Sequence, residues 1–381
     1  MIFSRIAALS LAVLLCACSS TKEPVAAVTK AKSVAKLLDF KQTATLQVRW
    51  QNAIGDAGNN ALQPAVVGDA VYAANAKGAL FRLQGASGKQ LWQIESGFVI
   101  SAGVGAGEGL VLIGGLKGEL AAYAEDGKLR WQSKVSSEVL SAPQVANGIV
   151  VVRTGDGRIT GLSAVDGTRQ WLYERATPAL VVRSHAGVTI KRGVVYAGFA
   201  GGKLAAIGLK NGVVAWESAV SQPRGNTELE RISDITSLPV VDDEQVCAVS
   251  FQGRLACFDI AQGSLLWSRD LSSDRGMVLQ GKYLYLTDAD GIVSALDKSS
   301  GSALWKNDQL TLRQTTTPTV FGNYVAVGDY EGYLHLLSRD DGAFVARLKT
   351  EEGAIQVAPL ELDGGLLLHT TTGGLYSVLP H

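Results

Sequence analysis

The sequence is poor in the residues that build catalytic and metal centres. It has only four histidines and four cysteines, and the histidines lie far apart, at His185, His335, His369 and His381. No pair has the H-x-x-x-H spacing of a zinc site, and neither C-x-x-C nor G-x-S-x-G occurs. We therefore expect no catalytic residues, no metal and no cofactor, and a protein that is not an enzyme.

An excess of charge of one sign and a long apolar run in the mature chain are also absent. Lys plus Arg and Asp plus Glu both number 35, so no overall field attracts nucleic acid. After the amino terminus, no segment is apolar for 18 residues, the length that a transmembrane helix needs. A protein with this composition reaches a membrane only through another anchor.

The amino terminus supplies a candidate anchor. A short basic start that ends at Arg5 precedes an apolar run from Ile6 to Leu15, which is too short to span a bilayer. The run Leu15-Cys16-Ala17-Cys18 that follows is similar to a bacterial lipoprotein signal. The resemblance implies removal of residues 1–17, acylation of Cys18, and sorting to the periplasmic side of the outer membrane because Ser19 follows. The alternative is an ordinary secretory peptide with a chance cysteine.

Residues 18–44 have little periodicity and many Lys, Ala, Ser and Thr residues, which predicts a flexible tether behind the acylated cysteine. From residue 45 onward, tryptophan recurs about every forty residues. The last six of the seven tryptophans end similar phrases such as GALFRLQGASGKQLW (78–92), and the full set is Trp50, Trp92, Trp131, Trp171, Trp216, Trp267 and Trp305. A fixed period of this size indicates a repeat architecture.

Within each repeat, apolar residues alternate with a period of two, and Gly, Asn or Asp clusters interrupt them every five to eight residues. This pattern is typical of short antiparallel strands joined by hairpin turns. Each phrase accounts for two strands, and the segment before it, such as QPAVVGDAVYAANAKG (63–78), accounts for two more. Four strands in about forty residues predict one blade of a β-propeller.

The repeats are complementary at their two ends. Seven full units run from about residue 62 to 346, whereas the eighth (357–378) lacks its tryptophan strand and TLQVRW (45–50) is such a strand without a unit. We therefore predict an all-β fold: an eight-bladed propeller of four-stranded antiparallel blades over residues 45–381, closed by pairing the N-terminal strand with the last blade. The tryptophans are structural, and Phe344 should partly fill the gap where Ala346 replaces one.

With Cys16 removed and Cys18 acylated, only Cys247 and Cys257 remain, on two consecutive predicted strands. Their offsets from the turn could place them side by side. Either a cross-strand disulfide or two buried free thiols accounts for the pair.

Loop lengths point to a binding surface. The crossover from Trp216 to Pro239 takes 23 residues where 11 to 14 is common, and the crossover after Trp171 carries the apolar run TPALVVRS (177–184). Both emerge on the same face from neighbouring blades, so we expect one docking surface made of Leu180 to Arg183 (the first insertion) and residues 221–236 (the second insertion). Its expected charged rim consists of Arg224, Glu228, Glu230, Arg231 and Asp234. In the alternative interpretation, Leu180 and Val182 only pack under the longer loop.

These features together resemble the BamB family, lipoprotein subunits of the outer-membrane β-barrel assembly machinery with quinoprotein-like repeats. In that family an L-x-L-R-like stretch and an acidic stretch after the fourth blade are implicated in holding BamA, the barrel subunit. Leu180, Val182 and Arg183 match the first stretch and Asp234 the second, while Thr236 stands where a second acidic residue would be expected. The resemblance implies a scaffold that binds the periplasmic domains of BamA, other assembly subunits and unfolded outer-membrane proteins. From the charged rim, we expect Arg231 to be a further contact.

Two other classes share propeller repeats. Quinoprotein dehydrogenases of this fold resemble the chain in its repeats but carry an adjacent Cys-Cys pair and a calcium-binding carboxylate set, which this sequence lacks. A periplasmic ligand-binding propeller would crowd aromatic residues on one face, whereas the tyrosines here are mostly on strands.

Overall fold

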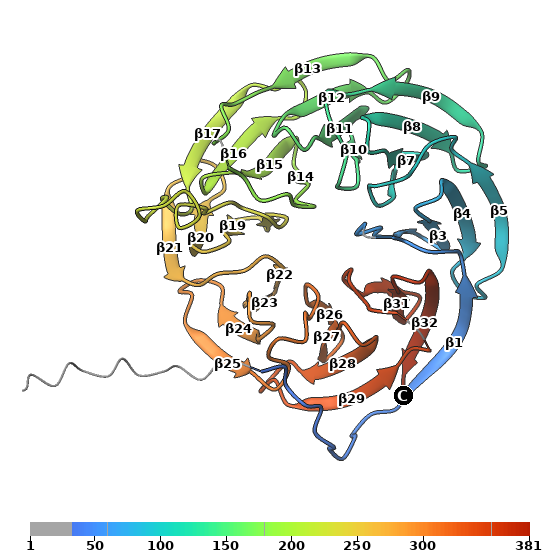
Figure 1. The fold of residues 1–381 in the computed structure, drawn as a ribbon, viewed down its shortest axis with the longest axis vertical. Helices are drawn as coiled ribbons and strands as arrows, with labels where there is room; N and C mark the ends of the chain where they lie inside the picture. Colours follow the sequence, from blue (N-terminus) through green and yellow to red (C-terminus); the bar gives the residue numbers. More distant parts are fainter. Residues whose placement is uncertain (1–32, 59, 179, 352) are drawn as a thin grey trace, which may run out of the picture. The chain divides into compact units, whose positions relative to one another are not determined.

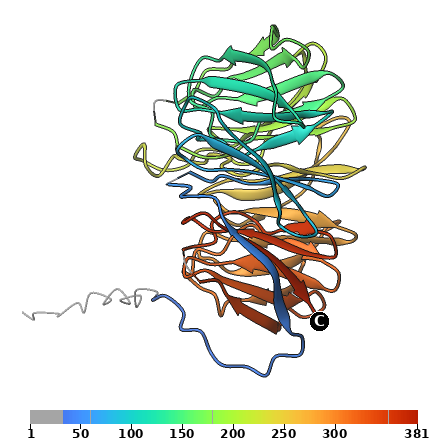
Figure 2. The ribbon, with the colours of Figure 1, turned by 90° about the vertical axis from the view of Figure 1, so that its right-hand side faces the viewer.

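The computed structural model describes residues 33–58, 60–178, 180–351 and 353–381. The predicted signal peptide, Cys18 and the first part of the predicted tether lie outside these residues. The described chain contains 32 strands in eight four-stranded antiparallel sheets and no helix. Figure 1 shows the sheets arranged as blades around a central axis, and Figure 2 shows the ring from the side. The predicted all-β, eight-bladed propeller is confirmed.

Each blade uses four strands in chain order from the inside of the ring to the outside, except the last (Figure 1). Blades one to four consist of β2 (Ala65–Val67), β3 (Ala70–Ala74), β4 (Ala79–Gln84) and β5 (Gln90–Glu95); β6 (Gly105–Gly107), β7 (Leu110–Gly114), β8 (Glu119–Ala124) and β9 (Leu129–Lys134); β10 (Gln144–Ala146), β11 (Ile149–Arg153), β12 (Ile159–Ser163) and β13 (Arg169–Tyr173); and β14 (Val188–Lys191), β15 (Val194–Phe199), β16 (Lys203–Gly208) and β17 (Val214–Ala219).

The remaining blades follow the same plan. They consist of β18 (Val240–Val241), β19 (Gln245–Val249), β20 (Arg254–Asp259) and β21 (Leu265–Asp270); β22 (Gly276–Gln280), β23 (Tyr283–Thr287), β24 (Val293–Asp297) and β25 (Ala303–Asn307); β26 (Thr319–Phe321), β27 (Tyr324–Gly328), β28 (Tyr333–Ser338) and β29 (Phe344–Lys349); and β30 (Leu360–Leu362), β31 (Gly365–His369), β32 (Gly374–Pro380) and β1 (Leu46–Ala53).

Ring closure depends on β1, the outermost strand of the eighth blade. It pairs antiparallel with β32, with Trp50 opposite Ser377 and Ala53 opposite Gly374. The first and last strands of the propeller therefore belong to one sheet, as the incomplete end repeats predict. This pairing leaves no blade without its fourth strand.

The tryptophans lie between consecutive blades. Each indole N–H donates to a backbone carbonyl of the next blade, for example Trp131 to Ala164 at 2.9 Å and Trp171 to Leu209 at 2.8 Å. The indole ring of each tryptophan also lies against a turn glycine of that next blade. Gly167 has a φ of 72°, and a Cβ there would lie 2.5 Å from the Trp131 ring. The repeated Gly and Trp are thus two halves of one contact, which joins the blades.

Ala346, where the tryptophan is missing, belongs to the core between the seventh and eighth blades, with Ala44 and Tyr376. Phe344 stacks on Phe40 with ring centroids 5.3 Å apart, and the Arg347 guanidinium lies 5.0 Å from the centre of the Phe40 ring. Phe40 comes from the segment before the propeller. Phe344 packs against the core between the sixth and seventh blades, so the prediction that it fills part of the gap at Ala346 is wrong.

This segment, residues 33–44, corrects the predicted extent of the tether. It lies along the seventh blade as a strap without regular secondary structure. Ala35 N donates to Thr311 O, and Thr43 N donates to Val345 O, both at 2.9 Å. Arg347 Nη1 donates to the Leu38 carbonyl at 3.1 Å. The strap binds through backbone groups and a few side chains, which is why its sequence shows no strand periodicity.

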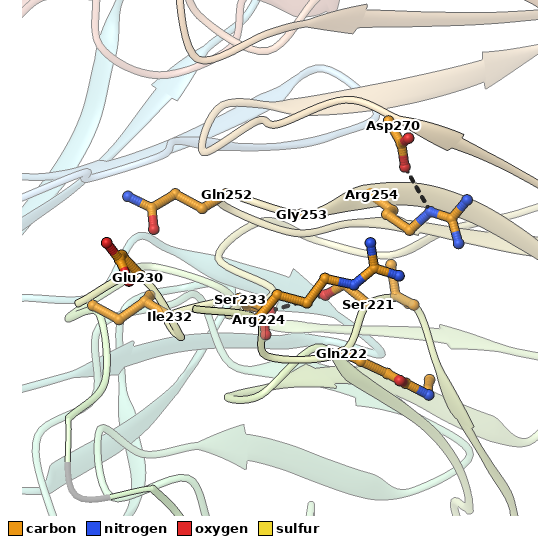
Figure 3. Close-up of a pocket in the computed structure, with 12 residues that line it drawn as sticks. Ser221, Gln222, Arg224, Glu230, Ile232, Ser233, Gln252, Gly253, Arg254 and Asp270 are labelled. Atoms are coloured by element: carbon orange, nitrogen blue, oxygen red, sulfur yellow. Dashed lines mark hydrogen bonds and ion pairs between the residues drawn. The ribbon is translucent and has the colours of Figure 1, made fainter. Parts of the chain in front are cut away.

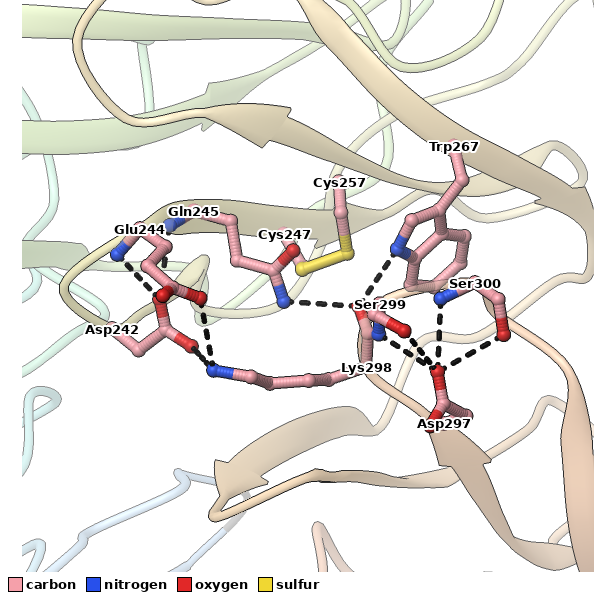
Figure 4. The surroundings of a disulfide bond; sticks show 10 residues. All are labelled: Asp242, Glu244, Gln245, Cys247, Cys257, Trp267, Asp297, Lys298, Ser299 and Ser300. Atoms are coloured by element: carbon pink, nitrogen blue, oxygen red, sulfur yellow. Dashed lines mark hydrogen bonds and ion pairs between the residues drawn. A yellow bond between two sulfur atoms is a disulfide. The ribbon is translucent and has the colours of Figure 1, made fainter.

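The structure joins Cys247 and Cys257 by a disulfide between paired positions of β19 and β20. Both residues are fully buried, beneath Trp267 of the outer strand (Figure 4). The carbonyl of Lys298 in the next blade accepts hydrogen bonds from Gln245 Nε2 and from Trp267 Nε1. The bond thus lies in the interior of the fifth blade, at its contact with the sixth.

The described residues contain neither a metal site nor a membrane-spanning helix. No group of three or more His, Cys, Asp or Glu side chains is arranged to hold a metal ion. Within the same residues, no helix has the length and hydropathy to cross a membrane.

Candidate docking surface

The two insertions meet on one face of the ring. The first insertion links β13 to β14 and the second links β17 to β18, so both are crossovers from an outer strand to the next inner strand. The carboxylate of Asp234 joins them: Oδ2 accepts from Val182 N at 2.8 Å, and Oδ1 accepts from Gly201 N at 2.9 Å. One side chain of the second insertion therefore fixes the backbone of the first.

The position of Asp234 differs from the expected charged rim. Only 4% of this residue is exposed, because the backbone of the first insertion covers it. Its two acceptor atoms are both occupied by backbone N–H groups, which suits a buried carboxylate. Asp234 is therefore a positioning residue beneath the docking surface and not part of its rim.

Apolar side chains of both insertions are exposed. Leu180 is 41% exposed and Val181 39%, whereas Val182 is half-buried against the ring. Leu229 and Leu238, in and just after the second insertion, are 67% and 50% exposed. Exposed leucines in two adjacent loops are unlike isolated surface leucines, and such a group is typical of a binding surface. The alternative interpretation, in which these residues only pack under the longer loop, therefore fits the half-buried Val182 better than the exposed Leu180.

The charged residues of the docking surface are held by local ion pairs. Arg183 Nε and Nη2 contact the two oxygens of Glu138 at 3.1 and 2.9 Å, and this pairing raises the pKa of the Arg183 guanidinium. Glu138 belongs to the crossover between the second and third blades. Arg231 is exposed and lies 3.7 Å from Glu228. In the same loop, N–H groups of residues 226 and 227 lower the pKa of the exposed Glu230 carboxyl.

Beneath the second insertion lies a hollow of about 400 Å³ (Figure 3). Its walls come from the insertion and from the fifth blade, where Arg254 at the start of β20 pairs with Asp270 at the end of β21 at 2.9 Å. Ser221 Oγ donates to the Ser233 carbonyl at 3.3 Å and holds the base of the insertion. Several side chains around the hollow are exposed and polar, so it is a polar recess at the side of the docking surface.

A second cavity, of about 230 Å³, opens between the two insertions. Glu138, Val182, Arg183 and Asp234 line it together with Arg153. Sequence reasoning missed Glu138 and Arg153. The sequence did contain a signal for Arg153, which is the last residue of the second strand in its blade. In the other seven blades this position is neither Lys nor Arg, and its residues are Ala74, Gly114, Phe199, Val249, Thr287, Gly328 and His369.

Comparison with known proteins identifies the family. The family model described as outer membrane protein assembly factor BamB matches residues 76–307 and 289–379. The chain belongs to the BamB family. A relative with that name in Nitrosomonas eutropha is 42% identical over 90% of this chain and 84% of its own length. Another, from Burkholderia pseudomallei, is 40% identical over 96% of this chain and 94% of its own.

Solved structures agree with this assignment. The crystal structure of BamB from Moraxella catarrhalis superposes with a TM-score of 0.80 at 28% identity, and the match covers 88% of this chain and all of the other. A quinohemoprotein alcohol dehydrogenase from Comamonas testosteroni reaches a TM-score of 0.72 at 13% identity. The second likeness concerns the propeller fold alone.

Proposed function

We propose that this chain is a non-enzymatic scaffold in the assembly of outer-membrane proteins, and that its docking surface binds the periplasmic part of BamA. The role in the assembly of outer-membrane proteins is supported by membership of a family that is named for it. The binding site is inferred from one observation: Asp234 joins two long crossovers. These crossovers expose Leu180, Val181 and Leu229 to solvent. Exposed apolar residues surrounded by charged pairs fit a protein partner.

In this proposal Cys18 carries the lipid that retains the propeller on the periplasmic side of the outer membrane. Anchoring raises the local concentration of the scaffold near its partner, which strengthens binding without any additional contact. The rigid ring then holds the assembly subunits, and with them the unfolded outer-membrane proteins, in a fixed arrangement.

The test replaces Leu180 and Arg183 together by alanine and measures co-purification with BamA from detergent-solubilised membranes. We expect at least a tenfold loss of affinity, because exposed apolar and arginine anchors dominate such interfaces. The matched control is Leu129→Ala with Arg130→Ala, a leucine and an arginine that are exposed on the outer strand β9. If the complex survives in the first variant, or is lost equally in the control, the docking surface is assigned wrongly.

A further inference from the structure

Arg153 is a half-buried arginine beside the first insertion. It ends β11, and its side chain reaches the 230 Å³ cavity between the two insertions. Its guanidinium carbon lies 5.5 Å from the centre of the Phe199 ring, and Nη1 is buried without a hydrogen-bond acceptor among the described residues. Burial lowers the pKa of Arg153 to about 10 and the charge of Asp234 acts in the opposite direction, so the group is still a cation at neutral pH.

The carboxylates around the cavity are already engaged by other donors. Both oxygens of Asp234 accept backbone N–H groups, and both oxygens of Glu138 accept from Arg183. A buried donor without an acceptor costs free energy, more so when it carries a charge. The contrast with Arg313 is direct: that buried arginine donates to Asp329, to Glu331 and to the Ala35 carbonyl.

We propose that Arg153 receives the carboxylate of an Asp or Glu side chain on the protein that binds the docking surface. The inference rests on the proposed function and names the chemistry of its central contact. The cavity opens beside Val181, Val182 and Arg183, so a side chain that enters it belongs to a molecule already in contact with the first insertion. Its volume is below the roughly 300–1,000 Å³ of small-molecule sites, which favours a single side chain. A carboxylate would pair with the guanidinium in a water-poor setting, where such hydrogen bonds are strong.

The test compares Arg153→Met and Arg153→Lys with the unaltered full chain, using the periplasmic part of BamA as the binding probe in calorimetry at two salt concentrations. We expect Arg153→Met to weaken binding at least tenfold and to reduce its salt dependence, and Arg153→Lys to retain part of the affinity. Thermal unfolding of Arg153→Met should be unchanged or shifted upward, because methionine fills the same space without a buried charge. A residue with a merely structural role would shift it downward.

Arg254→Met is the matched control, since Arg254 lines the neighbouring hollow and already has Asp270 as a partner. Replacing the acidic residues of the probe one at a time by their amides should reveal one change that weakens binding to the unaltered chain but not to Arg153→Met. The inference is overturned if Arg153→Met binds normally, if its weaker binding follows a loss of stability, or if Arg254→Met has the same effect. Normal binding by Arg153→Met while the Leu180 and Arg183 variant fails would leave the proposed function in place.

Discussion

At the scale of single residues, the buried polar groups of this propeller are structural parts with defined protonation states. Arg347 Nε donates to His335 Nδ1 at 3.2 Å, so the proton of the neutral ring is on Nε2, which donates to Asp329 Oδ2 at 3.0 Å. Nδ1 of His369 donates to the Leu62 carbonyl at 2.8 Å. Burial lowers the pKa of both histidines. The neutral ring is the form that the folded chain requires.

This requirement predicts a loss of stability in mild acid. Because the pKa of His369 is lower in the folded than in the unfolded chain, only the unfolded chain takes up the proton as pH falls below about 6.5. Each histidine of this kind can cost up to about 1.4 kcal/mol per pH unit below that value. In His369→Asn, whose amide can replace the Nδ1 donor, urea unfolding between pH 7.5 and 5 should show a smaller decrease than in the unaltered chain. Parallel curves would contradict the assignment.

The site residues show how far sequence reasoning reached at this scale. Loop length and apolar composition singled out Leu180 and Arg183, and both are exposed. The same reasoning placed Asp234 in the rim, because a loop has no periodicity that separates buried from exposed positions. Arg153 was missed for a different reason. Its significance depends on Asp234 and Glu138 being engaged by other donors, which only the folded contacts reveal.

At the scale of elements, the strap shows a segment that is specified by its neighbour. Residues 33–44 have no repeat of their own, and their place along the seventh blade depends on backbone hydrogen bonds and on the stack of Phe40 on Phe344. The strands could be predicted because apolar residues alternate with a period of two in each of them. The strap could not, because its contacts use backbone groups and one aromatic ring.

Phe40→Ala should therefore lower the free energy of unfolding by about 1–2 kcal/mol, from loss of the stack on Phe344 and of the contact with the Arg347 guanidinium. Leu38→Ala is the control, since the Leu38 side chain is largely exposed and its backbone carbonyl remains available to Arg347. Guanidinium unfolding followed by tryptophan fluorescence measures both. Equal midpoints for the two variants would show that the strap adds nothing to stability.

At the scale of the whole molecule, the repeats allow the fold to be predicted from the sequence. Eight units with the same turn glycines predict the same four strands, and each tryptophan predicts one contact with the next unit. The count of strands at the two ends then predicts the closure, which the pairing of Trp50 with Ser377 confirms. A fold without repeats would offer no such internal check.

The closure predicts different effects for two truncations. A chain that begins at residue 45 loses the strap but keeps β1, and it should remain a monomer with moderately reduced stability. A chain that begins at residue 54 lacks β1, so the edge of β32 is open to other chains. We expect it to associate and to lose about 5 kcal/mol or more of its folding free energy, a large part of what a typical domain has. Size-exclusion chromatography and urea unfolding measure both effects, and a monomeric second chain with an unchanged midpoint would contradict the prediction.

The same pairing orders events during synthesis. Arg49 and Ser377, which are hydrogen-bonded in the eighth blade, are 328 residues apart in the chain. The ribosome makes β1 before any other strand of the propeller and its partner β32 after all of them. Contacts between such distant residues are slow to form, and an unpaired strand is prone to pair with the wrong chain in the meantime. The new chain therefore stays vulnerable to aggregation until β32 has paired with β1, even when seven blades are already built.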